Sequence, residues 1–477
     1  MVREQRGDGR MAENDIASMG HLMRRAGFGA QYHELEARAA KGYEETVEEL
    51  LNPQDHPDGM DLDLAERYFI EWNHFIRGVP EYIAFRMINS ARQLEEKIVL
   101  FWHGILCISD SKLQSYPTEY EELELFRHHG LGSFKDLLLG ISKDPAMIYY
   151  LDNCLSHKGA INENYGRELL ELFSLGVGMD GEFNYSEEDV KECARAFTGW
   201  TIANSIPQQP YGRYAAQFVY NPDDHDDGEK TFLGETGNLN GEDVIDIIVK
   251  QPATARFISR HLYNFFVADD VEVPSWMDTP PRDPETIKML EDEYFRSDYN
   301  IKSMLRVLFN SDAFKNARFA KVKSPIETII GTLRLVGDWT EPKPGLEFIF
   351  DEMKYMGQEI LNPPSVEGWH TGKEWIDGGT LVHRINFTAD SVCNTSFPGI
   401  QSIIEKLAAQ GPTLSPEGLV DGCLKLLGDY EMSEETRRML VDQNSKGGEV
   451  QTDSEEFGAK VGETLRMIVA TKEYLYA

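Results

Sequence analysis

Cysteine is scarce and scattered in this sequence. No two cysteines are separated by only two residues, and their number is odd. This pattern argues against a disulfide framework and against a zinc knuckle. The five cysteines are Cys107, Cys154, Cys193, Cys393 and Cys423.

Basic residues and long apolar runs are also few. The 477 residues include 47 lysines and arginines against 81 aspartates and glutamates, a formal charge of −34. Such a surface repels phosphate backbones, so we expect no nucleic-acid partner. The longest apolar run, 98–108, is too short for a membrane span. No export signal is visible, so we expect a cytoplasmic protein as written, or an exported or periplasmic one if the N-terminus is truncated.

Apolar residues recur mostly at helical spacing, and two-residue alternation is rare. Helix starts are marked at Ser186, which begins a capping box with Asp189, and at Asp144, which precedes a proline. We therefore predict a mostly α, large multi-helix single domain with long irregular loops and at most a minor β element, such as a short strand at 217–220. The main domain covers 13–395, with an irregular insertion at 200–240. A helical C-terminal extension, 396–477, packs on it.

The predicted helix 162–176 has the most varied chemistry. At about 100° per residue, its polar side chains share one arc and its apolar side chains the other. An i, i+4 pair of Glu163 and Arg167 is typical of a solvated face, which is one interpretation. The lack of lysine and the early asparagines favour hydrogen-bonded packing, and hence a site. The polar residues are Asn162, Glu163, Asn164, Arg167, Glu168 and Glu171.

His103 lies in a helix that is apolar on nearly all sides. Burial favours the neutral imidazole, which a metal ligand or a general base requires. A core histidine satisfied by a backbone carbonyl, or by Glu96 seven residues earlier, fits the same pattern.

Two irregular segments carry further candidates. In 223–230, His225 and Asp226 could bind a divalent cation or act as an acid–base pair, with Lys230 as an anion clamp. A polar surface turn has the same composition. In 362–375, two prolines and the side chains of Trp369 and Trp375 suggest a stiff loop that either stacks against a sugar or fills a gap between helices.

Several of these segments resemble the bacterial family known as domain of unknown function 1800. The matching segments are 21–29, 101–104, 162–178, 194–200, 225–234, 251–262, 323–327, 357–369 and 383–387. The resemblance implies a helical protein without an established activity, often encoded beside a sulfatase-like partner and in many cases exported. Relatives tend to have a second histidine where this chain has Ile105, which puts a metal site at His103 in doubt. The shared polar, glycine and tryptophan positions favour a common site.

Together these patterns predict an enzyme with hydrolytic or metal-assisted acid–base chemistry, whose cofactor would be a divalent metal ion. The alternative is a non-catalytic binding or assembly protein that docks the sulfatase-like partner. If the carboxylates of 163–171 lie within hydrogen-bonding reach of His225 inside a cleft, the enzyme hypothesis is favoured. The candidate catalytic residues are Glu163, Arg167, Glu168, Glu171, His225, Asp226 and Lys230, the binding residues Asn162, Asn164, Asn362, Trp369, Trp375 and Arg384, and the metal ligands His103, His225 and Asp226.

Overall fold

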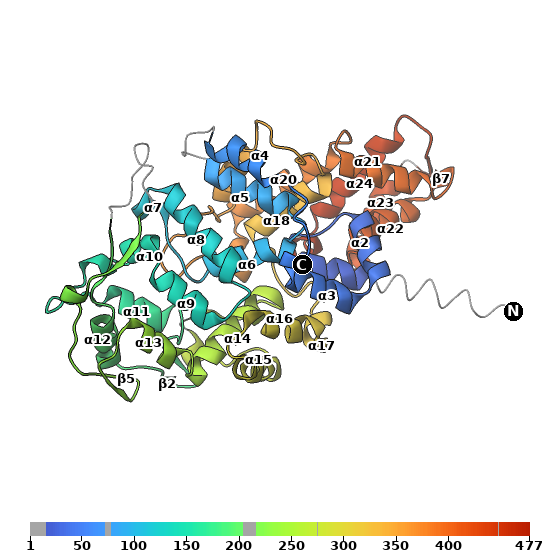
Figure 1. The fold of residues 1–477 in the computed structure, drawn as a ribbon. Helices are drawn as coiled ribbons and strands as arrows, with labels where there is room; N and C mark the ends of the chain where they lie inside the picture. Colours follow the sequence, from blue (N-terminus) through green and yellow to red (C-terminus); the bar gives the residue numbers. More distant parts are fainter. Residues whose placement is uncertain (1–15, 72–77, 204–215, 274, 447) are drawn as a thin grey trace.

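Helices dominate the fold (Figure 1). The computed structural model describes residues 16–71, 78–203, 216–273, 275–446 and 448–477, and residues 16–25 are helical. The N-terminal half continues with α2 (Tyr32–Lys41), α3 (Tyr43–Leu51), η1 (Pro53–Asp55), α4 (Leu62–Glu66), the π-helix η2 (Arg67–Glu71), α5 (Gly78–Asn89), α6 (Gln93–His103), α7 (Asp110–Leu113), α8 (Tyr116–His129), α9 (Phe134–Ser142), α10 (Pro145–Tyr150), η3 (Asn153–Leu155), α11 (Asn164–Glu171) and α12 (Glu187–Ala196).

The second half is also helical. It contains η4 (Pro222–Asp224), α13 (Gly241–Ile248), α14 (Pro252–Phe266), η5 (Ser275–Met277), α15 (Pro284–Arg296), α16 (Ile301–Asn310), α17 (Asp312–Lys315), α18 (Pro325–Val336), α19 (Phe348–Tyr355), η6 (Gly372–Trp375), α20 (Gly378–Cys393), α21 (Pro398–Ala408), α22 (Pro416–Leu426), α23 (Glu434–Ser445), α24 (Phe457–Val469) and η7 (Glu473–Leu475).

The described strands form two-stranded antiparallel pairs. The pairs are β1 (Gly178–Met179) with β2 (Glu182–Phe183), β3 (Trp200–Ile202) with β4 (Phe218–Tyr220), β5 (Lys230–Phe232) with β6 (Glu235–Gly237), and β7 (Thr413–Leu414) with β8 (Val450–Gln451). The prediction of a mostly α chain with a minor β element is confirmed.

Local capping explains where several helices begin. Ser186 and Asp189 form the reciprocal capping box at the start of α12. The Asp144 carboxylate accepts the backbone N–H groups of Ala146 and Met147 at the start of α10. Both helix starts were predicted from the sequence and are confirmed.

The core consists of one large apolar cluster and a second one formed by the C-terminal helices. The large cluster extends from Ile16 to Leu361. The second joins α20 to α21, α22, α23 and α24, and the last four of these helices lie together at one end of the molecule (Figure 1). Among the described residues, no helix combines the length and the apolar character needed to cross a bilayer.

Candidate functional site

The outer part of the α11 face forms ion pairs near solvent. Arg167 donates two hydrogen bonds to Glu187, at 3.0 and 2.7 Å, and lies 3.6 Å from the Glu163 carboxylate. The side chains of Glu163 and Glu187 are 39% and 73% exposed. These contacts fit the solvated-face interpretation for this part of the helix.

The two asparagines at the start of α11 have local partners. The Asn162 side chain accepts the backbone N–H of Asn164 at 3.0 Å. The Asn164 side chain donates to the Leu151 carbonyl at 3.2 Å. In the structure, both therefore fix the entry of the chain into α11.

The last turn of α11 has a different environment. Burial above all, together with the negative charges of Glu171 and Glu367, raises the pKa of Glu168 to about 7, while Arg167 opposes this rise. Glu171 accepts a hydrogen bond from the Tyr185 hydroxyl at 3.2 Å. A carboxyl group that titrates near neutral pH can both donate and accept a proton under ordinary conditions.

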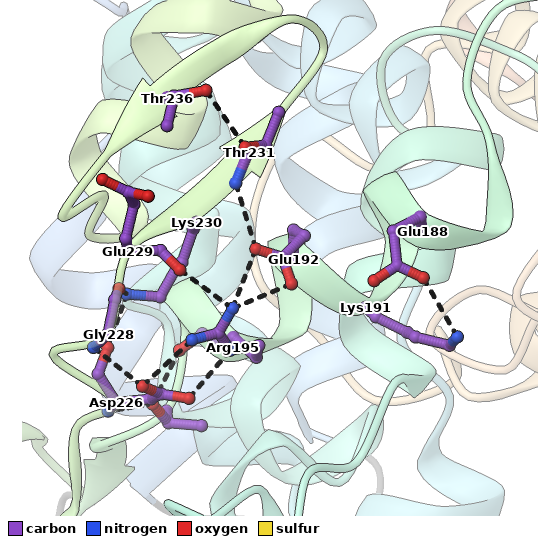
Figure 2. A network of polar contacts seen from close by, with 11 residues as sticks. Glu188, Lys191, Glu192, Arg195, Asp226, Gly228, Glu229, Lys230, Thr231 and Thr236 are labelled. Atoms are coloured by element: carbon purple, nitrogen blue, oxygen red, sulfur yellow. Dashed lines mark hydrogen bonds and ion pairs between the residues drawn. The ribbon is translucent and has the colours of Figure 1, made fainter.

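Asp226 belongs to a polar network that joins α12 to the 226–231 segment (Figure 2). The Arg195 guanidinium donates to the Asp226 carboxylate at 2.8 and 3.3 Å and to Glu192 at 2.8 and 2.9 Å. The Arg195 hydrogen bonds lower the pKa of Asp226 to about 2. Glu192 in turn accepts the Thr231 N–H at 3.1 Å.

His225 and Lys230 are held within the same segment. The His225 imidazole is 3% exposed, and its Nδ1 donates to the Thr198 carbonyl at 2.9 Å. The Lys230 ammonium donates to the backbone carbonyls of Asp226 and Gly228. Burial lowers the pKa of Lys230. Both side chains thus hold the backbone around 225–230 in place.

Ion pairs link the α11 face and the His225 segment to different ends of α12. Arg167 pairs with Glu187 in the first turn of α12, and Asp226 pairs with Arg195 in its last turn. Eight residues of helix separate these positions, a rise of about 12 Å. The structure gives no contact between the carboxylates of 163–171 and His225 among the described residues.

His103 packs at the end of α6 against a segment distant in sequence. Its Nε2 accepts the Leu361 N–H at 3.1 Å, and its ring lies edge-on to Trp369 with centroids 5.3 Å apart. Burial lowers the pKa of His103 to about 4. The neutral imidazole therefore has the environment of a core histidine that anchors the 357–370 loop.

The 357–376 segment lies against α6 and α14. The Asn362 side chain accepts from the Ser109 hydroxyl at 2.7 Å, which ties the loop to the chain after α6. Trp369 and Trp375 are 9% and 7% exposed and pack together with Val322. The two tryptophans fill part of the space between helices and leave a cavity beside them.

This cavity has a volume of about 120 Å³ and is the strongest candidate site. Leu172, one turn after Glu168, contributes to its wall, and so does Glu367. Glu168 itself is not among the lining residues, but the charge of Glu367 acts on it, and Trp369 and Trp375 line the same cavity. Other polar and aromatic lining residues include His261, Asn264, Glu272, Trp276, Lys321, Ser324, Gln358, His370 and Thr371.

Sequence reasoning missed most of these side chains. Glu367 lies between Asn362 and Trp369, within the 362–375 segment that the prolines and tryptophans had marked as a candidate. Lys321 comes two residues before the 323–327 segment, and His261 lies within 251–262. Six of the segments that carry the family resemblance contain cavity residues or Arg384: 101–104, 162–178, 251–262, 323–327, 357–369 and 383–387.

Arg384 is not part of the cavity wall. It is 1% exposed and donates to the Lys323 carbonyl at 2.7 Å. Burial lowers its pKa to about 10. No group of three or more histidine, cysteine or carboxylate side chains is placed to hold a metal ion in the part of the chain that the structure describes.

These features define a helical protein with a tryptophan-lined cavity, one of whose lining carboxylates, Glu367, contributes to raising the pKa of Glu168 to about 7. The chain matches the family described as "Protein of unknown function (DUF1800)" over residues 21–476, and it belongs to that family. The match continues beyond the last quoted segment, 383–387, into the C-terminal helices. No curated protein and no solved structure matches the chain.

Proposed function

We propose that the protein is a hydrolytic enzyme that acts by acid–base catalysis on a small organic substrate held in the cavity. The observation that carries the proposal is the Glu168 carboxyl, with a pKa of about 7, under the influence of Glu367, which lines the cavity. In many hydrolases, one carboxyl group protonates the leaving group and a second carboxylate activates the attacking water.

Glu168 is the proposed acid. Near neutral pH a large fraction of its carboxyl groups hold a proton, which passes to the leaving oxygen as the bond to it breaks. The Glu367 carboxylate is the proposed base, which takes a proton from the attacking water. Water therefore adds across the broken bond, and one proton returns from Glu367 to Glu168 through solvent.

The aromatic wall supports the same proposal. Trp276, Trp369 and Trp375 supply apolar surface against which a ring-shaped substrate can lie. Asn264 and Gln358 add polar groups that orient a ligand. A mostly apolar pocket with a few convergent polar groups is the usual form of a small-molecule site.

The test is hydrolysis of a panel of nitrophenyl esters, neutral glycosides and uronides, followed by release of nitrophenolate. We expect turnover of at least one compound, and a loss of about 100-fold or more in kcat for Glu168→Gln and for Glu367→Gln. Activity should fall as the pH rises above about 7, because Glu168 loses the proton that it donates. Glu188→Gln is the matched control, since Glu188 is exposed on α12.

No turnover across the panel would contradict the proposal. Equal activity in the wild type and in both cavity variants would do so as well, because the two carboxyl groups would then have no part in the reaction. Either result would favour the alternative, a docking protein that uses the Glu163 and Arg167 side chains near the surface.

A further inference from the structure

Lys321, which lines the cavity, belongs to a group of buried positively charged side chains in a chain whose net charge is −34. Arg25, Lys97, Lys321 and Arg384 are all at most 2% exposed. Each acts electrostatically on one buried carboxylate, Glu327. A single carboxylate thus faces several buried cations.

Lys321 differs from the other cations in its partners. Lys97 forms a close ion pair with Glu327. Arg25 donates to the Phe266 carbonyl at 2.9 Å, and Arg384 has the Lys323 carbonyl. The Lys321 ammonium lies 3.9 Å from Glu327 and makes no hydrogen bond to any described residue. Lys321 is also the cation of this group that lines the cavity.

The surroundings of Lys321 favour an anion in the cavity. Ser324, the N-cap of α18, lines the same wall, so the positive end of a 12-residue helix faces this region. The nearby Asp269 carboxylate accepts the backbone N–H of Val322 at 2.9 Å. It therefore binds the backbone beside Lys321 and makes no hydrogen bond with the Lys321 ammonium. The Lys321 ammonium has no hydrogen-bond acceptor among the described residues, and a bound carboxylate in the cavity would supply one.

Other lining groups require a ligand that carries hydrogen-bond donors. Glu272 and Glu367 present carboxylate oxygens, which accept hydrogen bonds and repel further negative charge. Glu272 already accepts from the Thr371 hydroxyl. An aromatic acid would leave these acceptors unused, and a sulfate or phosphate would bring more acceptors and more negative charge. A single carboxylate on a hydroxyl-bearing ring meets both requirements.

We infer that the cavity binds a sugar carboxylate of the uronate class, with the carboxylate on Lys321, hydroxyl groups on the carboxylates and amides, and the ring against the tryptophans. The assignment of this ligand as a substrate rests on the proposed function, whereas its binding does not. Uronate binding without turnover would therefore contradict the proposed enzymatic function and support the proposed ligand.

The experiment is calorimetric titration of the full chain with glucuronate, up to about 20 mM. Glucose, benzoate and sulfate are titrated under the same conditions. We expect glucuronate to bind at least about tenfold more tightly than each of the other three. Lys321→Met should weaken glucuronate binding by about tenfold or more and leave glucose binding unchanged, because only the carboxylate contact is lost.

Lys373→Met is the matched control, since Lys373 is exposed close to Trp375, and it should bind glucuronate as the wild type does. Near-ultraviolet circular dichroism should show that Lys321→Met keeps its tertiary structure, because the Lys97 ion pair with Glu327 remains. If Lys321→Met is not folded, Lys321→Gln takes its place. Glucuronate binding no tighter than glucose binding, an equal loss in Lys373→Met, or tighter binding of sulfate or benzoate would overturn the inference.

Discussion

Burial controls the protonation of several individual residues more strongly than ion pairing does. Asp144 accepts two backbone N–H groups, which favour its charged form, yet burial raises its pKa to about 7. Glu122 is fully buried, and burial together with the charges of Asp144 and Glu119 raises its pKa well above the ordinary value. The folded chain thus holds protons that the unfolded chain releases at lower pH.

This protonation gives a prediction for Asp144. Its pKa is raised on folding, so its stabilising contribution is complete below about pH 4 and is lost as the pH rises through about 7. Asp144→Asn keeps an N-cap and removes the ionisation. The free energy of unfolding is measured in urea at about pH 5 and at about pH 8. Between these two pH values it should fall less in the variant than in the wild type, and the two losses should differ by an amount on the order of 2 kcal/mol.

Asp136→Asn, at an exposed position on α9, is the control and should keep the wild-type difference between the two pH values. A variant of Asp144 with the full wild-type loss would contradict the argument.

At the scale of elements, the cavity depends on how closely the 357–370 loop approaches the end of α6. Gly368 has φ +82°, and a Cβ atom there would lie 2.3 Å from the Gly104 carbonyl oxygen. The Leu361 N–H on the same loop donates to His103. The close backbone contact at Gly368 and the buried hydrogen bond of Leu361 together hold the loop that carries Glu367 and Trp369.

Gly368→Ala should therefore separate the loop from α6. Gly357→Ala is a matched control, because Gly357 has φ +93° and no atom within 4 Å of a Cβ. Both variants incur the backbone strain of a positive φ, about 1 kcal/mol, and Gly368→Ala should lose about 2 kcal/mol more through steric overlap. Urea unfolding measures the loss, and tryptophan fluorescence should shift to the red only in Gly368→Ala. Equal losses in the two variants would show that this close approach is unimportant.

At the scale of the whole molecule, excess negative charge on the chain coexists with a buried positive cluster. The formal charge of −34 makes the folded chain repel itself, because folding brings the acidic residues closer together. Arg25, Lys97, Lys321 and Arg384 are buried and do not offset this charge at the surface.

Monovalent salt should therefore stabilise the protein. Screening of like charges predicts a Tm several degrees higher at about 0.2 M than at about 0.01 M sodium chloride, followed by circular dichroism. Potassium chloride should give the same rise, because screening depends on ionic strength and not on the cation. A falling Tm would contradict the prediction, and a rise with divalent cations alone would indicate a specific cation site instead.

The sequence by itself determined the mostly helical class, the starting points of α10 and α12, and the family. Helical spacing, the Ser186 capping box and the N-cap at Asp144 act over a few residues, so local physics fixes them before any tertiary contact forms. The polar arc of α11 was also predictable, and with it the candidate Glu168.

Only the tertiary structure decided which of these side chains meet. Arg167 contacts Glu187, the His225 imidazole contacts Thr198, and the charge of Glu367 acts on Glu168, about 200 residues away in sequence. The cavity takes its walls from α6, α14 and the 357–375 region, none of which contains a pocket by itself. Packing of buried faces over long sequence separations sets these contacts, and periodicity within one helix carries no information about the partner of its face.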